Sequence, residues 1–370
     1  MKIIIAPDKF KGSLTSFEVC SAISLGIKKV DQSINVLEFP MADGGDGFSS
    51  VMKYYFDTDT IYCDTVDPLG RSISVSYQWD KEDKIAIIEM AVASGLVLLT
   101  EKERNPLLAS SLGTGLLIKD AIGKGAKKII LGLGGSATND AGIGILTALG
   151  FQFMDENNDI LQASGESLFK IKKINAPSFI ADIKFEIACD VQNVLFGPQG
   201  AAYIYAAQKG ANQEQVKYLD EGLKNFAVTI KGKTGKDIST IPGTGAAGGI
   251  AAGLLPFFDV EMKKGIQMII DASKIREQIT GTDLLITGEG KIDNQSSEGK
   301  VVGCISALAR HYGIPVIALC GELQLDETGI KNLGLQKVIA IKDSFVSKEE
   351  AMKNAGKLLG KKVIEMLQSL

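Results

Sequence analysis

Three segments of the chain combine closely spaced glycines with acids, hydroxyls or lysines, which are groups that could bind and move a phosphate. The densest is GLGGSATNDAGIG (132–144), which follows an apolar run. Glycines let the backbone approach a phosphate closely, and a helix that begins after such a turn favours negative charge. A tight strand-to-helix turn without a ligand is the alternative. The candidate cofactor-binding residues of this segment are Gly134, Gly135, Ser136, Asn139 and Asp140.

The segment ITGEGKIDNQSSEGK (286–300) supplies carboxylates, hydroxyls and lysines within one short loop after a strand. Carboxylates in such a place can hold Mg²⁺ or accept a hydroxyl proton, and a lysine can contact phosphate oxygens. Capping and turn roles would explain one or two of these residues but not the whole set. The candidates are Gly288, Glu289, Gln295, Ser296 and Lys300 for the cofactor, with Asp293 and Glu289 as metal ligands.

The third segment, APDKFKGSLT (6–15), lies between a strand and a helix near the N-terminus. It offers Asp8, Lys11 and Ser13, together with N–H groups at the start of the helix, to an anionic ligand. A lysine-rich loop of this kind is otherwise only a solvated surface.

Two smaller acidic clusters complete the set of candidates. Asp43 and Asp46 lie in MADGGDG (41–47), where a turn role beside the glycines competes with a catalytic one. Asp190 lies in ACDVQN (188–193), directly behind an apolar strand, and is the better candidate for chemistry.

The chain contains a single histidine, His311, in a segment that reads as a helix C-terminus, where an imidazole suits the negative end of the helix. A Ser-His-Asp hydrolase or a histidine-dependent dehydrogenase would have to use this one residue, and most zinc enzymes need several histidines, so these classes are disfavoured. Any proton in the reaction must therefore be moved by Asp, Glu or Lys.

The common nucleotide-binding signatures give one open alternative. The P-loop pattern fails, because the Gly232-Lys233-Thr234 triplet has Ala227 where the first glycine belongs. The GxGxxG match that begins at Gly243 follows a proline instead of a strand. The run from Gly132 to Ala137 does follow a strand, so a dinucleotide-dependent oxidoreductase stays possible on the residues alone.

Hydrophobic periodicity predicts an α/β protein. Residues 2–6 form a β-branched strand, and Thr15 with Glu18 fits a capping box at the start of the next helix. Apolar strands near the C-terminus alternate with helical stretches, a pattern typical of parallel strands covered by helices on both faces. These strands are expected at 283–290, 315–322 and 337–343, and the helical stretches at 299–312 and 348–368.

The middle of the chain differs in texture. The segments 72–79 and 84–91 read as paired strands, and further strands are expected at 127–135, 185–191 and 201–208. We therefore expect a discontinuous domain from both termini, residues 1–65 plus 250–370, with residues 66–249 inserted as a second domain. The active site is expected in the cleft between them.

Composition restricts the partners and the compartment. A formal charge of −4 and a pI near 5.4 leave no general basic field, which argues against nucleic acid or an anionic membrane as partner. The N-terminal apolar run ends after Ile5, which is too short for a signal peptide, so a cytoplasmic location is expected. The five cysteines are scattered without a CxxC pair, which predicts core thiols in a reducing compartment.

Taken together in this order, the motif segments resemble the type 1 glycerate kinase family of bacteria. The blocks that carry the resemblance run from residue 1 to about 365 and are APDKFKGSLTS, ADGGDG, DPLGR (67–71), GLGGSATNDAGIG, ACDV, AAQKGA (206–211), PGTGAAGG (242–249) and ITGEGKIDNQSSEGK. Two departures are Ala207 and Val194, where the family pattern commonly has proline. They affect local turn geometry and leave the motif residues in place.

The resemblance implies a flavodoxin-like (Rossmann-like) parallel-sheet domain and a smaller inserted α/β domain. It also implies a kinase that uses ATP and Mg²⁺ to phosphorylate glycerate, with the 2-position favoured, as a monomer or homodimer. We expect the 132–144 and 288–300 loops to serve the ATP phosphates and Mg²⁺. Substrate-binding candidates are Lys11, Ser13, Arg71, Asp43 and Asp46, and candidates for the general base are Asp190 or Asp293, then Asp8.

Three functions stay open on the sequence: the kinase, an NAD(P)-dependent oxidoreductase acting on a small hydroxy acid, and a non-catalytic binding protein. The oxidoreductase would use the Gly132 loop but lacks a histidine acid/base and a clear acid for the ribose. Loose transition states of phosphoryl transfer need positioning and charge neutralisation, which glycine loops, lysines and acids supply. The residues therefore favour the kinase.

Overall fold

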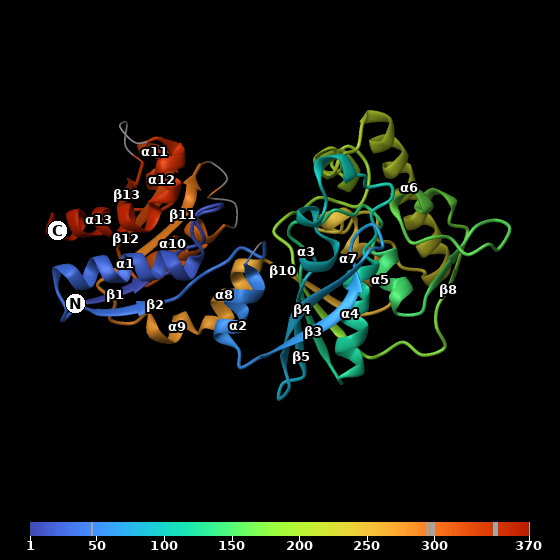
Figure 1. Cartoon of the computed structure of the whole chain (residues 1–370), viewed down its shortest axis with the longest axis horizontal. Coiled ribbons are helices and arrows are strands. Elements are labelled where there is room, and N and C mark those ends of the chain that lie inside the picture. The colour runs from blue at the N-terminus through green and yellow to red at the C-terminus, as the bar shows by residue number, and fades with distance from the viewer. Residues whose placement is uncertain (46, 294–295, 297–299, 343–346, 370) are drawn as a thin grey trace. The chain divides into compact units, whose positions relative to one another are not determined.

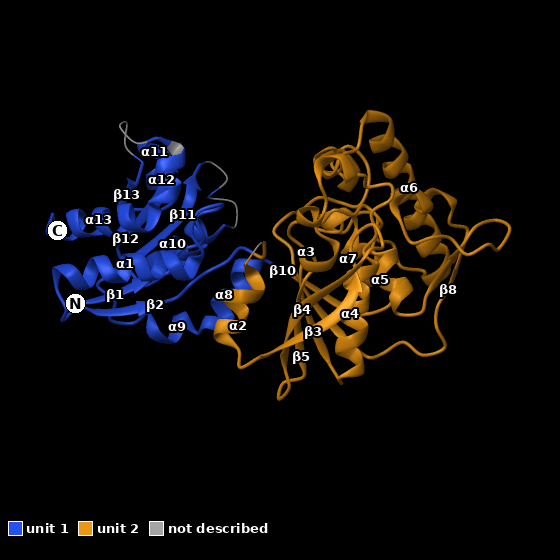
Figure 2. Cartoon of the chain, viewed as in Figure 1, with its two compact units in different colours: residues 1–43, 264–370 blue, residues 44–263 orange. Residues whose placement is uncertain are grey.

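The structure is a computed structural model, and it describes residues 1–45, 47–293, 296, 300–342 and 347–369. The chain divides into two compact units (Figure 2). Unit 1 consists of residues 1–43 and 264–370, and unit 2 of residues 44–263. The chain therefore leaves unit 1 once, builds unit 2 and returns, as expected for an inserted domain.

Unit 1 is built on a parallel sheet of five strands in the order β13-β12-β11-β1-β2. Numbered along the chain within this unit, the order is 2-1-3-4-5, which is that of the flavodoxin-like fold. β1 pairs with β2 on one side and with β11 on the other, so that Ile4 lies opposite both Leu37 and Leu285. The strands are β1 Lys2–Ile5, β2 Asn35–Glu38, β11 Leu284–Ile292, β12 Val316–Leu323 and β13 Lys337–Ala340.

Helices cover both faces of this sheet. Ile3, Ile4 and Ile5 are fully buried, as expected for a central parallel strand whose alternate side chains enter opposite layers. Ile3 and Ile5 join one core cluster with α1 and α13, while α10 contacts β11 and β12 (Figure 1). The helices are α1 Ser16–Val30, α8 Gly265–Ser273, α9 Ile275–Gln278, α10 Val301–His311, α11 Glu327–Asn332, α12 Lys348–Lys353 and α13 Ala355–Gln368.

The capping box predicted for α1 is confirmed. The Thr15 hydroxyl accepts a hydrogen bond from the Glu18 N–H at 3.2 Å, and the Glu18 carboxylate accepts one from the Thr15 N–H at 2.8 Å. This pair satisfies two backbone donors and fixes where the helix begins. The Asp8 to Ser13 loop is therefore bounded by β1 on one side and a capped helix on the other.

Unit 2 contains a six-stranded sheet in the order β10-β9-β6-β5-β4-β3 and a two-stranded antiparallel sheet of β7 and β8. β5, β6, β9 and β10 are parallel, whereas β4 and β3 continue the sheet antiparallel from β5. The predicted pairing of 72–79 with 84–91 is thus confirmed. The strands are β3 Asp59–Val66, β4 Ser72–Asp80, β5 Ile85–Glu89, β6 Lys128–Gly132, β7 Gln152–Met154, β8 Lys173–Asn175, β9 Lys184–Ala188 and β10 Asp259–Lys263.

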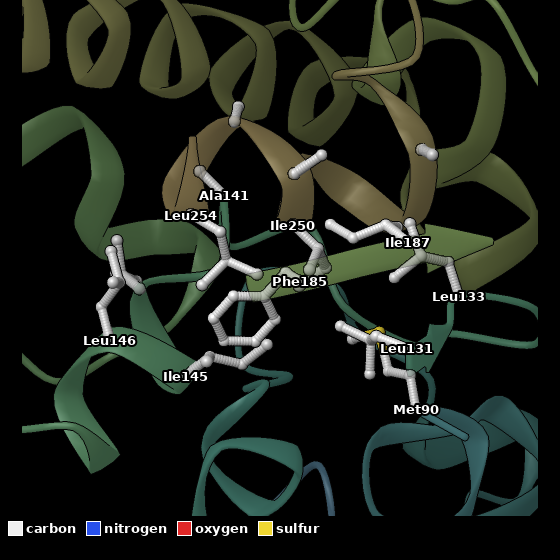
Figure 3. Packing of buried hydrophobic residues seen from close by; sticks show 14 of the residues in the cluster. Met90, Leu131, Leu133, Ala141, Ile145, Leu146, Phe185, Ile187, Ile250 and Leu254 are labelled. Atoms are coloured by element: carbon white, nitrogen blue, oxygen red, sulfur yellow. The ribbon is translucent and has the colours of Figure 1, made fainter. Parts of the chain in front are cut away.

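The core of unit 2 forms where helices cover the parallel strands. Phe185 and Ile187 of β9 belong to one buried cluster with Ile145 of α5 and Leu254 of α7 (Figure 3). The helices of this unit are α2 Phe48–Tyr55, α3 Ala91–Ser94, α4 Leu112–Gly123, α5 Ile143–Ala148, α6 Gln213–Thr234 and α7 Ile250–Leu254. Among the described residues, no helix is both long and apolar enough to cross a membrane.

Two details of the expected organisation differ in the structure. The division falls at 43/44 and 263/264 instead of 65/66 and 249/250, because β3 pairs with β4 and β10 pairs with β9 in the sheet of unit 2. The inserted unit is consequently the larger of the two. The pattern of apolar residues could not show that β3 pairs with β4 or that β10 pairs with β9, because the tertiary fold decides which strands lie side by side.

The segment 201–208, expected as a strand, is helical. It forms a π-helical turn, η4 Ala202–Ala206, followed by a 3₁₀ turn, η5 Ala207–Lys209. Ala202 and Ala206 are buried while Tyr203 and Ile204 are exposed, which is helical spacing and not strand alternation.

Three of the five cysteines, Cys20, Cys189 and Cys320, are buried thiols as expected, whereas Cys63 and Cys304 are partly exposed. His311 is the last residue of α10.

Close packing of α4 on α5 provides a stability test. A Cβ added at Gly115 would lie 2.6 Å from the Ile145 Cα and 2.7 Å from the Ala148 Cβ, whereas one added at Gly123 would meet open space. We expect Gly115→Ala to destabilise the protein by about 2 kcal/mol through overpacking. Gly123→Ala, in the same helix, should stabilise it by about 0.5 kcal/mol. Urea unfolding followed by circular dichroism measures both, and equal effects would contradict the described packing.

Candidate functional site

In unit 1, the candidate residues gather at the carboxyl ends of β1 and β11. The chain runs from β1 through α1 to β2 on one side of the sheet and from β11 through α10 to β12 on the other. Open α/β sheets bind ligands where strand order reverses in this way. The Asp8 N–H donates to the Gly288 carbonyl at 2.8 Å, which extends the parallel ladder beyond β1 and fixes Asp8 beside β11.

Asp8 is a nearly buried carboxyl group with 6% exposure. Its pKa is raised to about 7, chiefly by burial and also by the charges of Asp43 and Glu289, against the lowering effect of Lys9. The Lys9 Nζ lies 3.8 Å from Asp8 and 3.7 Å from Asp43, between the two carboxylates. Asp8 can therefore change its proton near neutral pH, which suits a group that accepts a proton during a reaction.

Glu289, in β11, is the second buried acid, with 7% exposure. Burial raises its pKa, and so do the charges of Asp293 and Asp43. The Ser296 hydroxyl donates to its Oε1, and Lys300 attracts the charged form, so both lower the pKa.

Asp293 follows β11 in a turn that Ser296 closes. The Asp293 N–H donates to the Ser296 hydroxyl at 3.1 Å, and the Ser296 N–H donates to the Asp293 carbonyl at 2.9 Å. The Asp293 carboxylate pairs with Lys291 at 3.0 Å and keeps 20% side-chain exposure. The turn thus presents one partly exposed carboxylate beside the buried Glu289.

Unit 1 consequently brings together Asp8, Asp43, Glu289, Asp293 and Ser296, with Lys300 close enough to act on Glu289. Lys11, on the Asp8 loop, is exposed. The Ser13 hydroxyl donates to the Met352 carbonyl at 2.5 Å and so ties the loop to α12. Gln295 and Asp46 lie outside the described residues.

Close packing requires residues without a side chain at positions 288 and 290. A Cβ at Gly288 would lie 2.3 Å from the Leu319 carbonyl oxygen, and one at Gly290 would lie 3.1 Å from the Lys11 N. These glycines let β12 and the Asp8 loop approach β11 closely. This close approach needs glycine whether or not a ligand contacts it.

In unit 2, the candidates lie at the carboxyl edge of the parallel strands. Glu89 at the end of β5, Gly132 at the end of β6 and Ala188 at the end of β9 lie side by side in register. The glycine-rich loop follows Gly132, and Asp190, which is partly exposed, follows Ala188. Strand ends of this kind meet at one edge and there form binding sites.

Two glycine motifs that are far apart in sequence touch within unit 2. A Cβ at Gly134 would lie 2.6 Å from the Gly45 Cα, and Gly135 has a φ of +73°, which favours glycine. The loop after β6 therefore packs directly on the start of the 44–47 segment. The lack of side chains at Gly134 and Gly45 is what allows these two backbone segments to touch.

Asp140 is fully buried, and its carboxylate accepts hydrogen bonds only from this protein's own backbone and Ser111, among the described residues. The donors are the Ser111 N–H and hydroxyl and the N–H groups of Gly142 and Gly144. Burial raises its pKa, and these hydrogen bonds lower it. Asp140 thus joins the start of α4 to the start of α5, beneath the loop instead of on its surface.

Ser136, Thr138 and Asn139 lie with Lys209, a residue that the sequence analysis did not select. The Lys209 Nζ donates to the Ser136 hydroxyl at 3.0 Å and to the Thr138 carbonyl at 2.6 Å. No composition signal marks a lysine as buried, so only its place in the AAQKGA block could have drawn attention to it.

Glu89 was also missed. Its carboxylate accepts a hydrogen bond from the Ser49 N–H, in the first turn of α2, at 2.6 Å. The rule that selected Asp190, an acid at the end of an apolar strand, applies equally to Glu89.

Arg71 lies elsewhere in unit 2, and acids already surround it. Its Nε contacts Asp67 at 2.5 Å and its guanidinium contacts Glu103 at 2.6 Å, with 49% of the side chain exposed. Both carboxylates raise the pKa of Arg71. A substrate carboxylate at this position would compete with both acids.

Comparisons with known proteins agree with the geometry over the whole chain. The sequence profile of the glycerate kinase family matches residues 3–370. This chain belongs to the glycerate kinase family. A glycerate kinase of Haemophilus influenzae is 42% identical over 92% of this chain and 91% of its own length. The glycerate 2-kinase of Escherichia coli is 38% identical over 96% of this chain and 94% of its own.

A solved structure supports the fold as well. The crystal structure of a Salmonella typhimurium LT2 protein provisionally named glycerate kinase 2 superposes with a TM-score of 0.87 at 34% identity, covering 100% of this chain and 98% of that one. The family consists of phosphotransferases with an alcohol group as acceptor, and this chain is an enzyme of that class. The family match therefore argues against the alternative of a dinucleotide-dependent oxidoreductase.

The place of Asp140 leads to a prediction. Asp140→Ala would leave several buried donors at two helix starts without an acceptor, so we expect a loss of about 3 kcal/mol in the free energy of unfolding. Asp182→Ala, at an exposed position of the same unit, is the control and should change it by less than about 0.5 kcal/mol. A stable Asp140→Ala protein with weakened ATP binding would instead assign Asp140 to the ligand.

Proposed function

We propose that this enzyme transfers the γ-phosphate of ATP to glycerate, with 2-phosphoglycerate as the favoured product. The observation that carries the proposal is the full-length family match to proteins named glycerate kinase, one of them named glycerate 2-kinase. The buried carboxylates of unit 1 and the glycine-rich loop of unit 2 are the parts that phosphoryl transfer needs.

Asp8 is our first candidate for the base that accepts the hydroxyl proton. It combines a fixed position after β1, near-complete burial and a pKa of about 7, which matches a base that works near neutral pH. Asp293 is held in an ion pair with Lys291, and Asp190 is partly exposed. Both stay in the proposal as second candidates.

Mg²⁺ fits the acids that follow β11. Mg²⁺ is commonly bound by one or two carboxylates together with substrate phosphates and water, and not by an all-protein cage. This agrees with the described residues, among which no cluster of three or more acids, histidines or cysteines could hold a metal alone. Glu289 and Asp293 would hold the ion, which when bound neutralises charge on the transferred phosphoryl group.

The remaining candidates receive roles that follow from their surroundings. The backbone of Gly134 and Gly135 and the hydroxyl of Ser136 would bind ATP phosphates, and Lys300 would add positive charge beside Glu289. Lys11 is the better partner for the glycerate carboxylate, because Arg71 is already paired with two acids. The other candidates keep the roles proposed from the sequence, which are substrate binding for Ser13, Asp43 and Asp46 and cofactor binding for Asn139, Asp140 and Gln295. A reducing, cytoplasmic setting agrees with the buried thiols of Cys20, Cys189 and Cys320.

A coupled assay of ADP release tests the function. With ATP, Mg²⁺ and glycerate we expect ADP in proportion to the glycerate added, and phosphorus NMR of the product should show the 2-phosphate. ADP release that is independent of glycerate, tartronate and related acids would overturn the proposal. A 3-phosphate product would correct the regiochemistry alone.

The choice of base can be tested by three substitutions. Asp8→Asn should lower kcat by at least about 100-fold with little change in KM, because a base acts mainly on the transition state. Asp190→Asn and Asp293→Asn should lower kcat less than Asp8→Asn if Asp8 is the base. Near-normal turnover of Asp8→Asn would exclude Asp8 as the general base and leave Asp190 and Asp293 as the candidates.

The raised pKa of Asp8 also predicts a stability effect. Its folded-state pKa of about 7 exceeds the ordinary value of 3.8, so folding disfavours the ionised form. Relative to Asp8→Asn, the wild type should therefore lose stability as the pH rises from about 4 to about 7, by about 4 kcal/mol, and stay constant above that. Urea unfolding across this range measures the difference.

A further inference from the structure

Lys209 is a buried cation directly beneath the glycine-rich loop. Only 6% of the residue is exposed, and its ammonium donates to the Ser136 hydroxyl and the Thr138 carbonyl. Within the described part of the chain, no carboxylate lies within ion-pair distance of it, although Asp140 attracts it from farther away. An ammonium has three donors, and these two contacts use two of them.

The backbone fixes where this ammonium points. Lys209 ends the η5 turn, and Gly210 follows with a φ of +99°. A Cβ at Gly210 would lie 2.2 Å from the Arg104 carbonyl oxygen, so this turn is clamped against the segment that follows η2 (Glu101–Glu103). The side chain therefore enters the loop from a rigid support.

The loop residues above Lys209 are clamped as well. A Cβ at Gly248 would lie 2.2 Å from the Thr138 carbonyl oxygen and 2.5 Å from the Asn139 Cα. Backbone packing therefore confines Thr138 and Asn139 on one side, while Lys209 supplies the charged contact to this part of the loop. A site held this firmly is organised before its ligand arrives.

A second polar group at the same place lacks a partner. The side chain of Asn139 is fully buried, and neither its amide oxygen nor its amide nitrogen has a hydrogen-bond partner among the described residues. Buried polar groups are nearly always satisfied, so an exception calls for a function. Beneath this loop, Lys209 thus has one N–H donor beyond its two contacts, and the Asn139 amide has no hydrogen-bond partner among the described residues.

The energetics favour a ligand as the missing partner. The pKa of Lys209 is lowered to about 7, because burial outweighs the opposing attraction of Asp140. An uncompensated buried charge is costly, whereas an apolar side chain of similar size could fill the same space without that cost. The arrangement becomes favourable when an anion binds on the loop, because its charge then stabilises the ammonium.

We propose that Lys209 is a positioning residue for the nucleotide phosphates. It holds Ser136 and Thr138 in the conformation that receives a phosphate, and it adds positive charge beneath the loop. The identity of the anion as ATP rests on the proposed function. The inference itself is that Lys209 contributes to the affinity for ATP and not to the affinity for glycerate.

The test compares Lys209→Met, Lys209→Arg and a control, Lys224→Met, at an exposed position of α6 with 54% side-chain exposure. Titration calorimetry with ATP and steady-state kinetics are measured for each. Lys209→Met should weaken ATP binding and raise the KM for ATP at least about tenfold, while the KM for glycerate changes less than about threefold. Lys209→Arg should recover part of the ATP affinity, and Lys224→Met should match the wild type.

The outcomes separate this inference from the proposed function. Wild-type ATP affinity in Lys209→Met overturns the inference even if glycerate is phosphorylated. Loss of ATP binding in that variant, in a protein that does not phosphorylate glycerate, supports the inference and overturns the function. If Lys209→Met does not fold, Lys209→Arg, which keeps the charge but changes the geometry of the contacts to Ser136 and Thr138, should still raise the KM for ATP more than that for glycerate, and an equal rise in both KM values would contradict the inference.

Discussion

Parallel pairing of adjacent strands is the constraint on which both candidate sites depend. In unit 1 it brings the residues after β1 beside those of β11, so that Asp8 and Glu289 share one poorly hydrated place. In unit 2 the same rule aligns the ends of β5, β6 and β9 and so collects Glu89, the glycine-rich loop and Asp190. Each strand contributes little chemistry by itself, and register decides which groups meet.

The two sites use burial differently. In unit 1, several acids are held close together with Lys9 between two of them, so that ionisation of one carboxylate raises the cost of ionising the next. In unit 2, glycines lack side chains and so let backbone segments touch, and the buried ammonium of Lys209 lies beneath the glycine-rich loop. The first arrangement suits proton transfer and the second suits binding of an anion.

Much of this could be predicted from the sequence because local signals agreed with the fold. The Thr15 capping box, the strands that precede Asp8, the glycine-rich loop after Gly132 and Asp190, and the inserted topology were all readable. The pairing of β3 with β4 and of β10 with β9 was not readable, and it places the unit boundaries at 43/44 and 263/264. The 201–208 segment alternates apolar and aromatic residues but folds as helical turns, because its small residues pack four apart. Lys209 escaped notice, since burial of a lysine depends on neighbours more than 70 residues away.

The place of β1 at the centre of its sheet has a consequence for synthesis of the chain on the ribosome. Ile3 pairs with Leu284, which emerges 281 residues later. All of unit 2 is made within that interval and can complete its own sheet, while one edge of β1 has no native neighbour to cover it. The nascent protein therefore carries an apolar strand edge until the residues of β11 emerge. The short length of β1, four residues from Lys2 to Ile5, limits how much of that edge is open to other chains.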